Sequence, residues 1–191
     1  MVIPHKPAAK RRVATPGKGS AAMKSSSKPA TGFSEEAGEA YLIVRGGGRR
    51  IKDQFIDKVF AKMVARDPGV AAKLRLARSG FSASVLPGMV NYLDVSKKTV
   101  FTVLKTPEST AHKAILEDKT LKPETSERII RIADITRLAE ETFGGREHAV
   151  SWLKRENPAL NGASPLSMLD TGLGAEEVRK VLTAINYGGV F

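Results

Sequence analysis

The chain has 191 residues and a formal net charge of +11 at pH 7, from 31 basic and 20 acidic side chains. Its hydrophobic fraction of 41% suffices for a packed core and excludes a wholly disordered chain. Because cysteine is absent, a disulfide scaffold, a thiolate nucleophile, a zinc finger and an iron–sulfur site are excluded. No apolar run approaches the roughly 20 residues of a membrane helix, and the start lacks the apolar stretch of a secretory signal. We therefore expect a cytoplasmic protein.

The positive charge is confined to the first 80 residues. Residues 1–32 carry +7 and no acidic side chain, residues 33–80 carry +4, and residues 81–191 are formally neutral. The first segment is rich in Lys, Ala, Ser, Pro and Gly, which predicts a disordered basic tail. Four roles are compatible with such a tail: solubility, contact with DNA phosphates, binding of an acidic partner, and targeting to an organelle. Its prolines argue against the helix that a transit peptide requires.

The part of the chain before residue 81 contains a glycine run and two predicted helices. The run at 46–48 indicates a hinge, because the spaced glycines and the Lys-Ser/Thr pair of a nucleotide loop are missing. Apolar residues recur at helical spacing over 51–64. Asp67 and Pro68 are then predicted as the N-cap and first-turn proline of a second helix, which ends at Gly80.

Three short helices are predicted next. The first covers 84–93, the second follows the N-cap Ser96, and the third starts at the cap Ser109 or Thr110 after a turn. Two short helices joined by a tight turn are typical of a helix-turn-helix, whose second helix enters the major groove of DNA. The predicted DNA contacts are Lys97, Lys98, Ser109, Thr110, His112 and Lys113.

A solvated surface is the alternative interpretation of that third helix. Glu117 and Asp118 near its end favour this alternative, because acidic side chains are repelled by phosphates. A pair of short helices also occurs in many helical bundles, so the spacing alone leaves both interpretations open.

Four further helices complete the pattern. A long helix is predicted over 123–143 and ends at Gly144. Another carries apolar residues over 149–153, a short one is capped by Ser164, and the last begins near Ala175. All recognisable periodicity in the folded part is helical, which predicts an all-α protein.

The chain ends on the apolar segment 187–191, although chain ends are usually polar and frayed. Tyr187 and Phe191 either pack on their own domain or insert into a partner, and burial physics leaves both open. Trp152, the only tryptophan, is most simply a core residue.

No catalytic or metal-binding constellation is recognisable. His5, His112 and His148 lie far apart in the sequence and lack the spacing of metal ligands. The acidic residues mostly lie near basic ones, as on solvated helix faces. We therefore expect neither an enzyme nor a bound cofactor.

Residues of many types recur in a recognisable order towards the end of the chain. The pieces are Pro123–Ile135, Phe143-Gly144, Ala149-x-x-Trp152-Leu153, Asn157-Pro158-Ala159-Leu160-x-Gly162, Ser164–Gly174, Val178, Leu182, Ile185 and Tyr187-Gly188. This pattern, over about residues 80–191, resembles the Xre/MbcA/ParS antitoxin family. Typical members carry several arginines on the recognition helix, where this chain has Ser109-Thr110-Ala111-His112-Lys113.

The resemblance implies an antitoxin that neutralises a RES-domain toxin, an enzyme that consumes NAD or uses it for ADP-ribosylation. Neutralisation would cover the toxin's active site, and the complex, a homodimer or a larger heteromer, would bind operator DNA and repress its own operon. A stand-alone helix-turn-helix transcriptional regulator is the alternative. The implied toxin-binding residues are Trp152, Leu166, Leu169, Tyr187, Gly188, Gly189, Val190 and Phe191.

These expectations combine into one domain organisation. We predict a disordered basic tail (1–32), a helical extension and linker (33–80), an Xre-like helix-turn-helix module (81–127) and a small helical toxin-binding domain (128–191).

Overall fold

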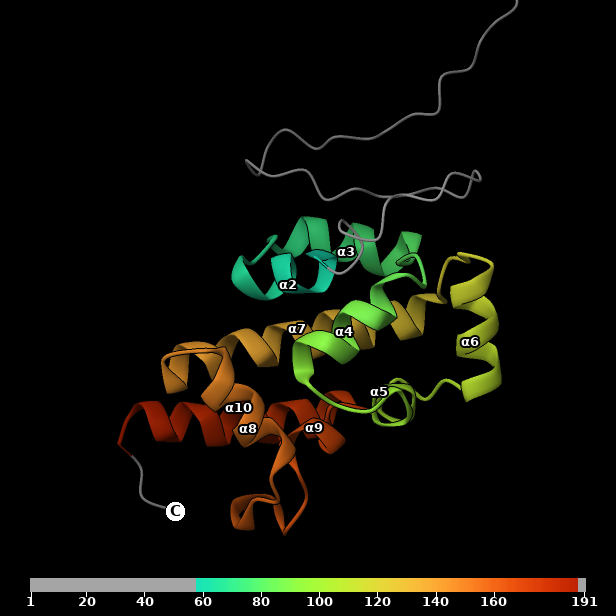
Figure 1. Ribbon diagram of the computed structural model, residues 1–191. Coiled ribbons are helices and arrows are strands. Elements are labelled where there is room, and N and C mark those ends of the chain that lie inside the picture. Colours follow the sequence, from blue (N-terminus) through green and yellow to red (C-terminus); the bar gives the residue numbers. More distant parts are fainter. Residues whose placement is uncertain (1–57, 189–191) are drawn as a thin grey trace, which may run out of the picture. The chain divides into compact units, whose positions relative to one another are not determined.

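The computed structural model describes residues 58–188 (Figure 1). Predictions for the basic tail, the glycine run at 46–48, the start of the first helix and residues 189–191 lie outside the described residues. Within 58–188, all regular structure is helical apart from one isolated antiparallel bridge between Ser82 and Thr120. The predicted all-α class is confirmed.

The described helices follow one another with short connections. They are α2 Lys58–Ala65, α3 Val70–Ser79, α4 Val85–Leu93, α5 Lys97–Val103, α6 Glu108–Leu116, α7 Pro123–Phe143, α8 Arg146–Lys154, the 3₁₀ turn η2 Pro158–Leu160, α9 Pro165–Met168 and α10 Gly172–Asn186. Among these helices, none combines the length and apolar character needed to cross a membrane.

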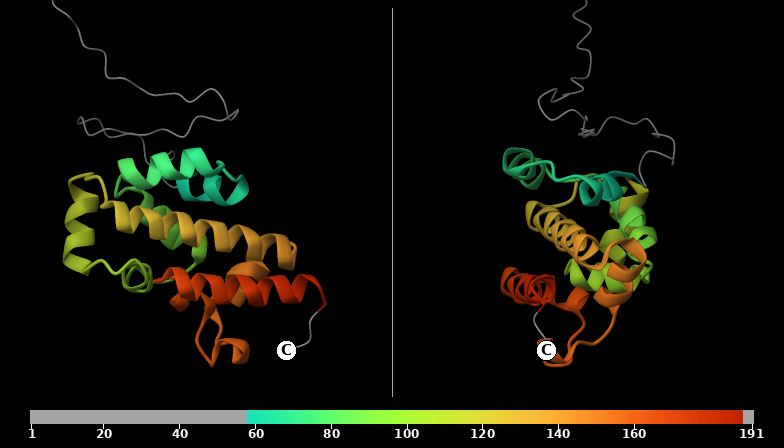
Figure 2. Two further views of the ribbon diagram at one scale, coloured as in Figure 1. Left: turned by 180° about the vertical axis from the view of Figure 1, so that it is seen from behind. Right: turned by 90° about the vertical axis from the view of Figure 1, so that its left-hand side faces the viewer.

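The long helix α7 lies at the centre of the fold. It contacts α2 and α3 on one side and α8 and α10 on the other, and Figure 2 shows α3 and α10 on opposite sides of it. Ile129, Ile132 and Ile135 follow one another at a spacing of three residues and are at most 1% exposed. This buried stripe joins the layers on both sides of α7 into one hydrophobic core.

Local capping chemistry sets the ends of several helices where the sequence predicts them. The Ser96 hydroxyl accepts a hydrogen bond from the Thr99 amide at 3.0 Å, and the Ser164 hydroxyl accepts one from the Ser167 amide at 3.4 Å. At the other end of a helix, Gly144 adopts the left-handed conformation, with φ of 75°, and terminates α7.

The start of α3 differs from the predicted one. Asp67 and Pro68 do not cap this helix, which begins at Val70. The Asp67 carboxylate instead accepts a hydrogen bond from the Gly69 amide at 2.9 Å, and Gly69 has φ of 77°. A short Asx turn therefore precedes the helix, because a residue with positive φ cannot belong to its first turn.

The predicted cap of α6 is also wrong. The helix begins at Glu108, and Pro107 is its N-cap instead of Ser109 or Thr110. Pro107 has an extended backbone, with ψ of 140°, and its fixed φ suits a residue that directly precedes a helix.

The last helix, α10, begins three residues earlier than predicted, at Gly172 rather than Ala175. Thr171 is the N-cap, and its hydroxyl accepts a hydrogen bond from the Gly174 amide at 3.0 Å. A Cβ atom on Gly174 would overlap the carbonyl oxygen of Met168. This glycine therefore permits a close approach of α9 to α10 and does not interrupt the helix.

The helices α2 and α3, which lie within the predicted helical extension, pack as a layer of the core. Phe60, Met63 and Val64 of α2 are at most 2% exposed. The Phe60 ring packs edge to face on Tyr92 of α4, with 5.5 Å between the ring centroids. Leu76 of α3 is also buried in the same core.

Candidate functional site

The helices α5 and α6 correspond to the predicted helix-turn-helix pair. Ala111 is the buried residue of α6, and the ring of His112 packs edge to face on Phe101 of α5, with 5.5 Å between centroids. The outer side of α6 is otherwise open to solvent. His112, predicted as a DNA contact, therefore also positions α6 against α5.

The other predicted DNA-contacting side chains are accessible. Lys97 and Lys98 lie at the start of α5, and Ser109, Thr110 and Lys113 lie on the outer side of α6. The three lysines are exposed and form no ion pair within residues 58–188. The geometry therefore leaves them available to phosphates.

The exposed side of α6 also carries an apolar residue that sequence reasoning missed. Leu116 is 87% exposed and lies seven residues after Ser109, on the same side of the helix. The sequence could have predicted this exposure, because Leu116 directly follows Ile115, which packs against the core. Adjacent residues of a helix point about 100° apart, so an apolar residue next to the buried side can face solvent.

Part of the predicted toxin-binding set belongs to the core. Leu166 and Leu169 are 4% and 0% exposed, so they support the α9–α10 packing and present little surface to a partner. Trp152 of α8 is half-buried and packs on Phe143, with 5.3 Å between ring centroids.

Two large apolar side chains stand out from the ends of α10. Leu173 is 85% exposed and Tyr187 is 88% exposed. They are fourteen residues apart, with Lys180 midway, so they lie on nearly the same side of the helix and are separated by about 21 Å along its axis. The sequence predicted Tyr187 but missed Leu173, which the predicted start of the helix had left in a loop.

The chain turns at the end of α10. Gly188 is exposed and has φ of 74°, a conformation that favours glycine. The predicted toxin-binding residues Gly189, Val190 and Phe191 lie outside the described residues.

Polar contacts join the helix-turn-helix to the turn between α9 and α10. The guanidinium of Arg128, on α7, donates to the carbonyl oxygens of Asp170 at 3.3 Å and Leu104 at 3.5 Å. Lys105 of the α5–α6 turn forms an ion pair with the Asp170 carboxylate at 3.0 Å. One arginine therefore bridges the α5–α6 turn and the α9–α10 turn.

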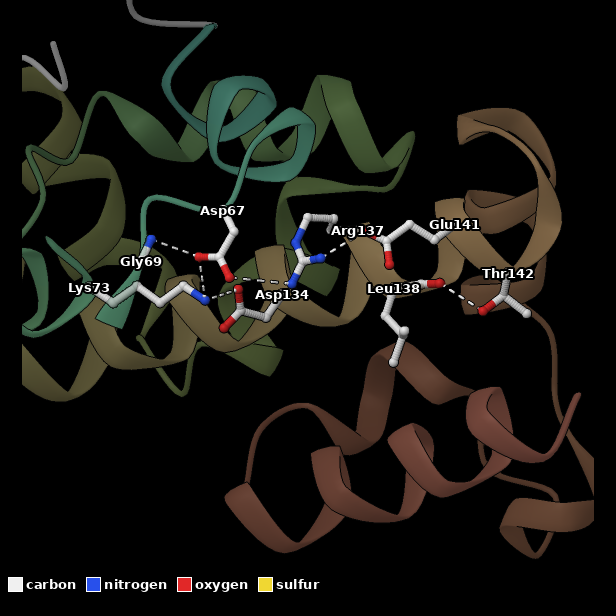
Figure 3. A network of polar contacts seen from close by, with 8 residues as sticks. All are labelled: Asp67, Gly69, Lys73, Asp134, Arg137, Leu138, Glu141 and Thr142. Carbon is white, nitrogen blue, oxygen red and sulfur yellow. Dashed lines mark hydrogen bonds and ion pairs between the residues drawn. The ribbon is translucent and has the colours of Figure 1, made fainter. Parts of the chain in front are cut away.

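A second network attaches α3 to α7 (Figure 3). The ammonium of Lys73 lies 2.9 Å from the Asp67 carboxylate and 2.7 Å from the Asp134 carboxylate. The hydrogen bond from Lys73 holds the pKa of Asp67 below its ordinary value of 3.8, although partial burial opposes this shift. Burial disfavours the charge on Lys73, but the bonds to Asp134 and Asp67 outweigh burial and raise the pKa of the amine.

Arg146 at the start of α8 makes a third connection. Its guanidinium lies 4.5 Å from the centroid of the Tyr92 ring and donates to the carbonyl oxygens of Tyr92 at 3.0 Å and Asn91 at 2.9 Å. The Tyr92 hydroxyl donates to Glu140 of α7 at 2.8 Å. Burial and the bond to Glu140 raise the pKa of this hydroxyl.

An open groove of about 560 Å³ lies between α5, α8 and α9. Lys98 and Lys154 are among its lining residues, and Lys154 is paired with Asp94 at 2.7 Å. Residues 58–188 contain no cluster of His, Asp and Glu side chains able to hold a metal ion.

Comparison with known proteins identifies the family domains that carry these surfaces. Residues 72–134 match the Antitoxin Xre-like helix-turn-helix domain, and residues 138–188 match the Antitoxin Xre/MbcA/ParS C-terminal toxin-binding domain. The chain is 30% identical over 125 residues to the "Prs ADP-ribosylating antitoxin" of Sphingobium sp. (strain YBL2), which covers 61% of this chain and 79% of that relative. The chain belongs to the Xre/MbcA/ParS antitoxin family.

Two further antitoxins of the family are similar. "Antitoxin Xre" of Yersinia enterocolitica is 28% identical over 112 residues, which cover 58% of this chain and 76% of that relative. "Antitoxin Xre" of Pseudomonas putida is 34% identical over 82 residues, which cover 43% and 52%. The predicted resemblance is confirmed.

The two family domains of this antitoxin share a helix. The helix-turn-helix domain includes α5 and α6 and extends to residue 134, within α7, and the toxin-binding domain begins at residue 138 of the same helix. Leu173 and Tyr187 belong to the toxin-binding domain, whereas the exposed lysines of α5 and α6 belong to the other.

Proposed function

We propose that this antitoxin neutralises a RES-domain toxin by covering the toxin's active site with its C-terminal region, and that α5 and α6 bind operator DNA to repress its operon. The observation that carries the toxin contact is the exposed pair Leu173 and Tyr187 on α10, within the family's toxin-binding domain. Burying such a side chain contributes about 1.5–3 kcal/mol, so two of them are a substantial anchor for a protein partner.

The charges on α10 suit the same role. Glu177 is paired with Lys180 at 2.8 Å, and Glu176 lies 3.4 Å from Arg179. The helix therefore presents no net charge between its two apolar ends. A partner can cover this surface without leaving an unpaired buried charge, which would oppose binding.

The chemistry of the proposed toxin rests on family resemblance. The name of the Sphingobium relative contains the words "ADP-ribosylating", which supports a partner that uses NAD. Tyr187 is the last described side chain before residues 189–191. The turn at Gly188 suits a chain that leaves α10 to enter a cleft. An aromatic residue at such a position is a common anchor in protein interfaces.

The test is co-expression with the toxin gene adjacent to this one, together with binding measurements on the purified pair. Leu173→Ala and Tyr187→Ala are each expected to weaken binding about tenfold or more, because each removes an exposed anchor without disturbing the core. Leu74→Ala is the matched control, since Leu74 is 49% exposed on α3, on the other side of α7. Equal effects at positions 173 and 74, or an adjacent gene that is harmless alone, would contradict the proposal.

Coverage of the active site has its own measurement. Deletion of residues 187–191 is expected to weaken inhibition of the toxin's NAD-consuming activity while thermal unfolding stays unchanged. Full inhibition by the shortened chain would overturn the proposed role of this end, Tyr187 included, and leave Leu173 as the proposed anchor on α10.

A stand-alone DNA-binding regulator is the second candidate. Lys97, Lys98 and Lys113 of the helix-turn-helix favour it, because they are exposed and form no ion pair within residues 58–188. Size-exclusion chromatography of the co-expressed pair separates the two functions, because an antitoxin forms a stable complex with its toxin and a stand-alone regulator elutes alone.

A further inference from the structure

The outer surface of α2 and α3 concentrates positive charge. Residues 58–80 contain six basic side chains and one acidic side chain, whereas residues 81–191 are formally neutral. The single carboxylate, Asp67, is engaged by Lys73, Arg137 and the Gly69 amide, so it does not neutralise the outer surface.

Four of these cations face away from the core. Lys58 and Lys62 lie four residues apart on α2, on the side opposite the buried Phe60. Arg75 and Arg78 lie three residues apart on α3. Both are exposed, whereas Leu76 between them is buried. All four are exposed and make no ion pair with any residue between 58 and 188.

This arrangement is unfavourable for folding by itself. Like charges three or four residues apart on a helix repel each other and destabilise it. A surface that gathers such pairs and lacks carboxylates is complementary to a polyanion, whose charges remove the repulsion.

The position of α3 indicates which polyanion. The C-terminal end of α3 lies beside the segment that follows α6: Ser82 forms a bridge with Thr120, and the Leu121 amide donates to the Phe81 carbonyl at 2.7 Å. In Figure 1, α6 rises to the same corner of the molecule as the end of α3. Arg78 lies three residues before Phe81, so it is close in sequence to the contact between the end of α3 and the segment that follows α6.

The recognition helix supplies little phosphate affinity of its own. Glu108 and Lys113 are its only fully charged side chains, so its net charge is zero. Because counterion release by Lys and Arg provides most sequence-independent affinity for DNA, that affinity must come from other elements.

We infer that the outer surface of α2 and α3, formed by Lys58, Lys62, Arg75 and Arg78, binds the phosphate backbone of duplex DNA beside the groove that α6 enters. The inference rests on the proposed operator binding by α5 and α6. These contacts hold the protein on the duplex without reading its sequence, and they leave base recognition to α6.

The test is the salt dependence of DNA binding by the full chain, measured by fluorescence anisotropy with a duplex from its own promoter. A variant with Lys58→Gln, Lys62→Gln, Arg75→Gln and Arg78→Gln is compared with the unaltered chain over a series of KCl concentrations. The slope of log Kobs against log[salt] is negative, and each phosphate contact contributes about −0.9 to it. The loss of four contacts should therefore make the slope shallower by about 3 to 4. The affinity ratio between the promoter duplex and an unrelated duplex is expected to stay unchanged.

The matched control removes four positive charges from the other side of α7. It carries Lys154→Gln, Arg155→Gln, Arg179→Gln and Lys180→Gln, so both variants have the same net charge. An unchanged slope in the α2–α3 variant, or an equal decrease in the control, overturns the inference. Competition by RNA or polyglutamate as effective as that by duplex DNA overturns the assignment to DNA.

The outcomes also separate this inference from the proposed function. If the unaltered chain binds no duplex, the proposed DNA binding fails and the inference fails with it. If it binds with a steep salt dependence that the α2–α3 variant retains, only the inference fails. The variant is expected to neutralise the toxin fully, and its thermal unfolding reports that the fold is intact.

Discussion

The two sides of α7 differ in how many of their cations have a carboxylate or aromatic partner. On the α8–α10 side, Arg146 lies over the Tyr92 ring, Lys154 pairs with Asp94, and Arg179 and Lys180 pair with glutamates one turn away. On the α2–α3 side, Lys58, Lys62, Arg75 and Arg78 have no such partner within the described residues. Charge that is neutralised locally leaves apolar surface free to bind a protein, whereas charge without partners is available to a polyanion.

The largest effect is expected for Gly174→Ala in the toxin-binding domain. It tests whether this domain can be destabilised without unfolding the helices on the other side of α7. Gly174→Ala places a Cβ atom against the Met168 carbonyl oxygen and 2.9 Å from its carbon, and backbone cannot yield cheaply. We expect a loss of about 3 kcal/mol or more in the free energy of unfolding, measured by urea denaturation. Gly172→Ala is the control, because its Cβ would meet only the Arg131 guanidinium at 3.9 Å. Its effect should stay within about 0.5 kcal/mol.

The same experiment shows how separate the two sides are. Because α7 belongs to both, far-ultraviolet circular dichroism and Trp152 fluorescence should report a single shared transition for Gly174→Ala. Two resolved transitions would instead mean that the α2–α6 part unfolds independently.

An intermediate effect concerns the ion network that attaches α3 to α7. Lys73→Met leaves the Asp134 carboxylate, only 21% exposed, without its 2.7 Å partner and beside Asp67. We expect the free energy of unfolding to fall by about 2 kcal/mol at pH 7.

The pH dependence of that difference has a defined sign. The pKa of Asp67 is lowered in the folded protein, so its contribution is present above about pH 4 and lost as the pH falls through the folded value. The pKa of Lys73 is raised above 10.5, so its contribution is present below that pH and lost as the pH rises through the folded value. The difference between the unaltered chain and Lys73→Met should therefore be greatest between about pH 5 and pH 10. A difference that is constant from pH 3 to pH 8 would show that lost packing, not charge, causes it.

The smallest effect compares single cations from the two sides. Arg146→Gln loses the Tyr92 ring contact and at least one of two carbonyl contacts, and should cost about 1 kcal/mol in thermal unfolding. Arg78→Gln should change stability by less than about 0.5 kcal/mol, since its charge has no partner among the described residues. Similar losses for both substitutions would show that Arg78 has a structural role.

Features set by neighbouring residues could be predicted from the sequence. The caps Ser96 and Ser164 act on amides three residues ahead, and Pro123 and Gly144 limit α7 through their own backbone preferences. Ile129, Ile132 and Ile135 of α7 recur at helical spacing, and the structure buries all three.

Features set by distant residues could not be predicted. Gly174 lies within α10 because the Met168 carbonyl leaves no room for a Cβ atom there, although glycine has a low intrinsic helix propensity. Leu173 is therefore an exposed helical residue. Phe60 is buried because Tyr92 of α4 packs on it, which no local pattern reveals. The α2–α3 surface likewise depends on which cations find carboxylates in the fold.

The shared helix α7 has a consequence for the lifetime of the antitoxin in a cell. A protease cut within α7 would expose Ile129, Ile132 or Ile135, on which the layers of both sides pack. Degradation then cannot remove the toxin-binding domain and leave the helix-turn-helix domain folded, nor remove the helix-turn-helix domain and leave the toxin-binding domain folded. Release of the toxin and renewed transcription of its operon would follow from one proteolytic event. The two would therefore occur at the same time.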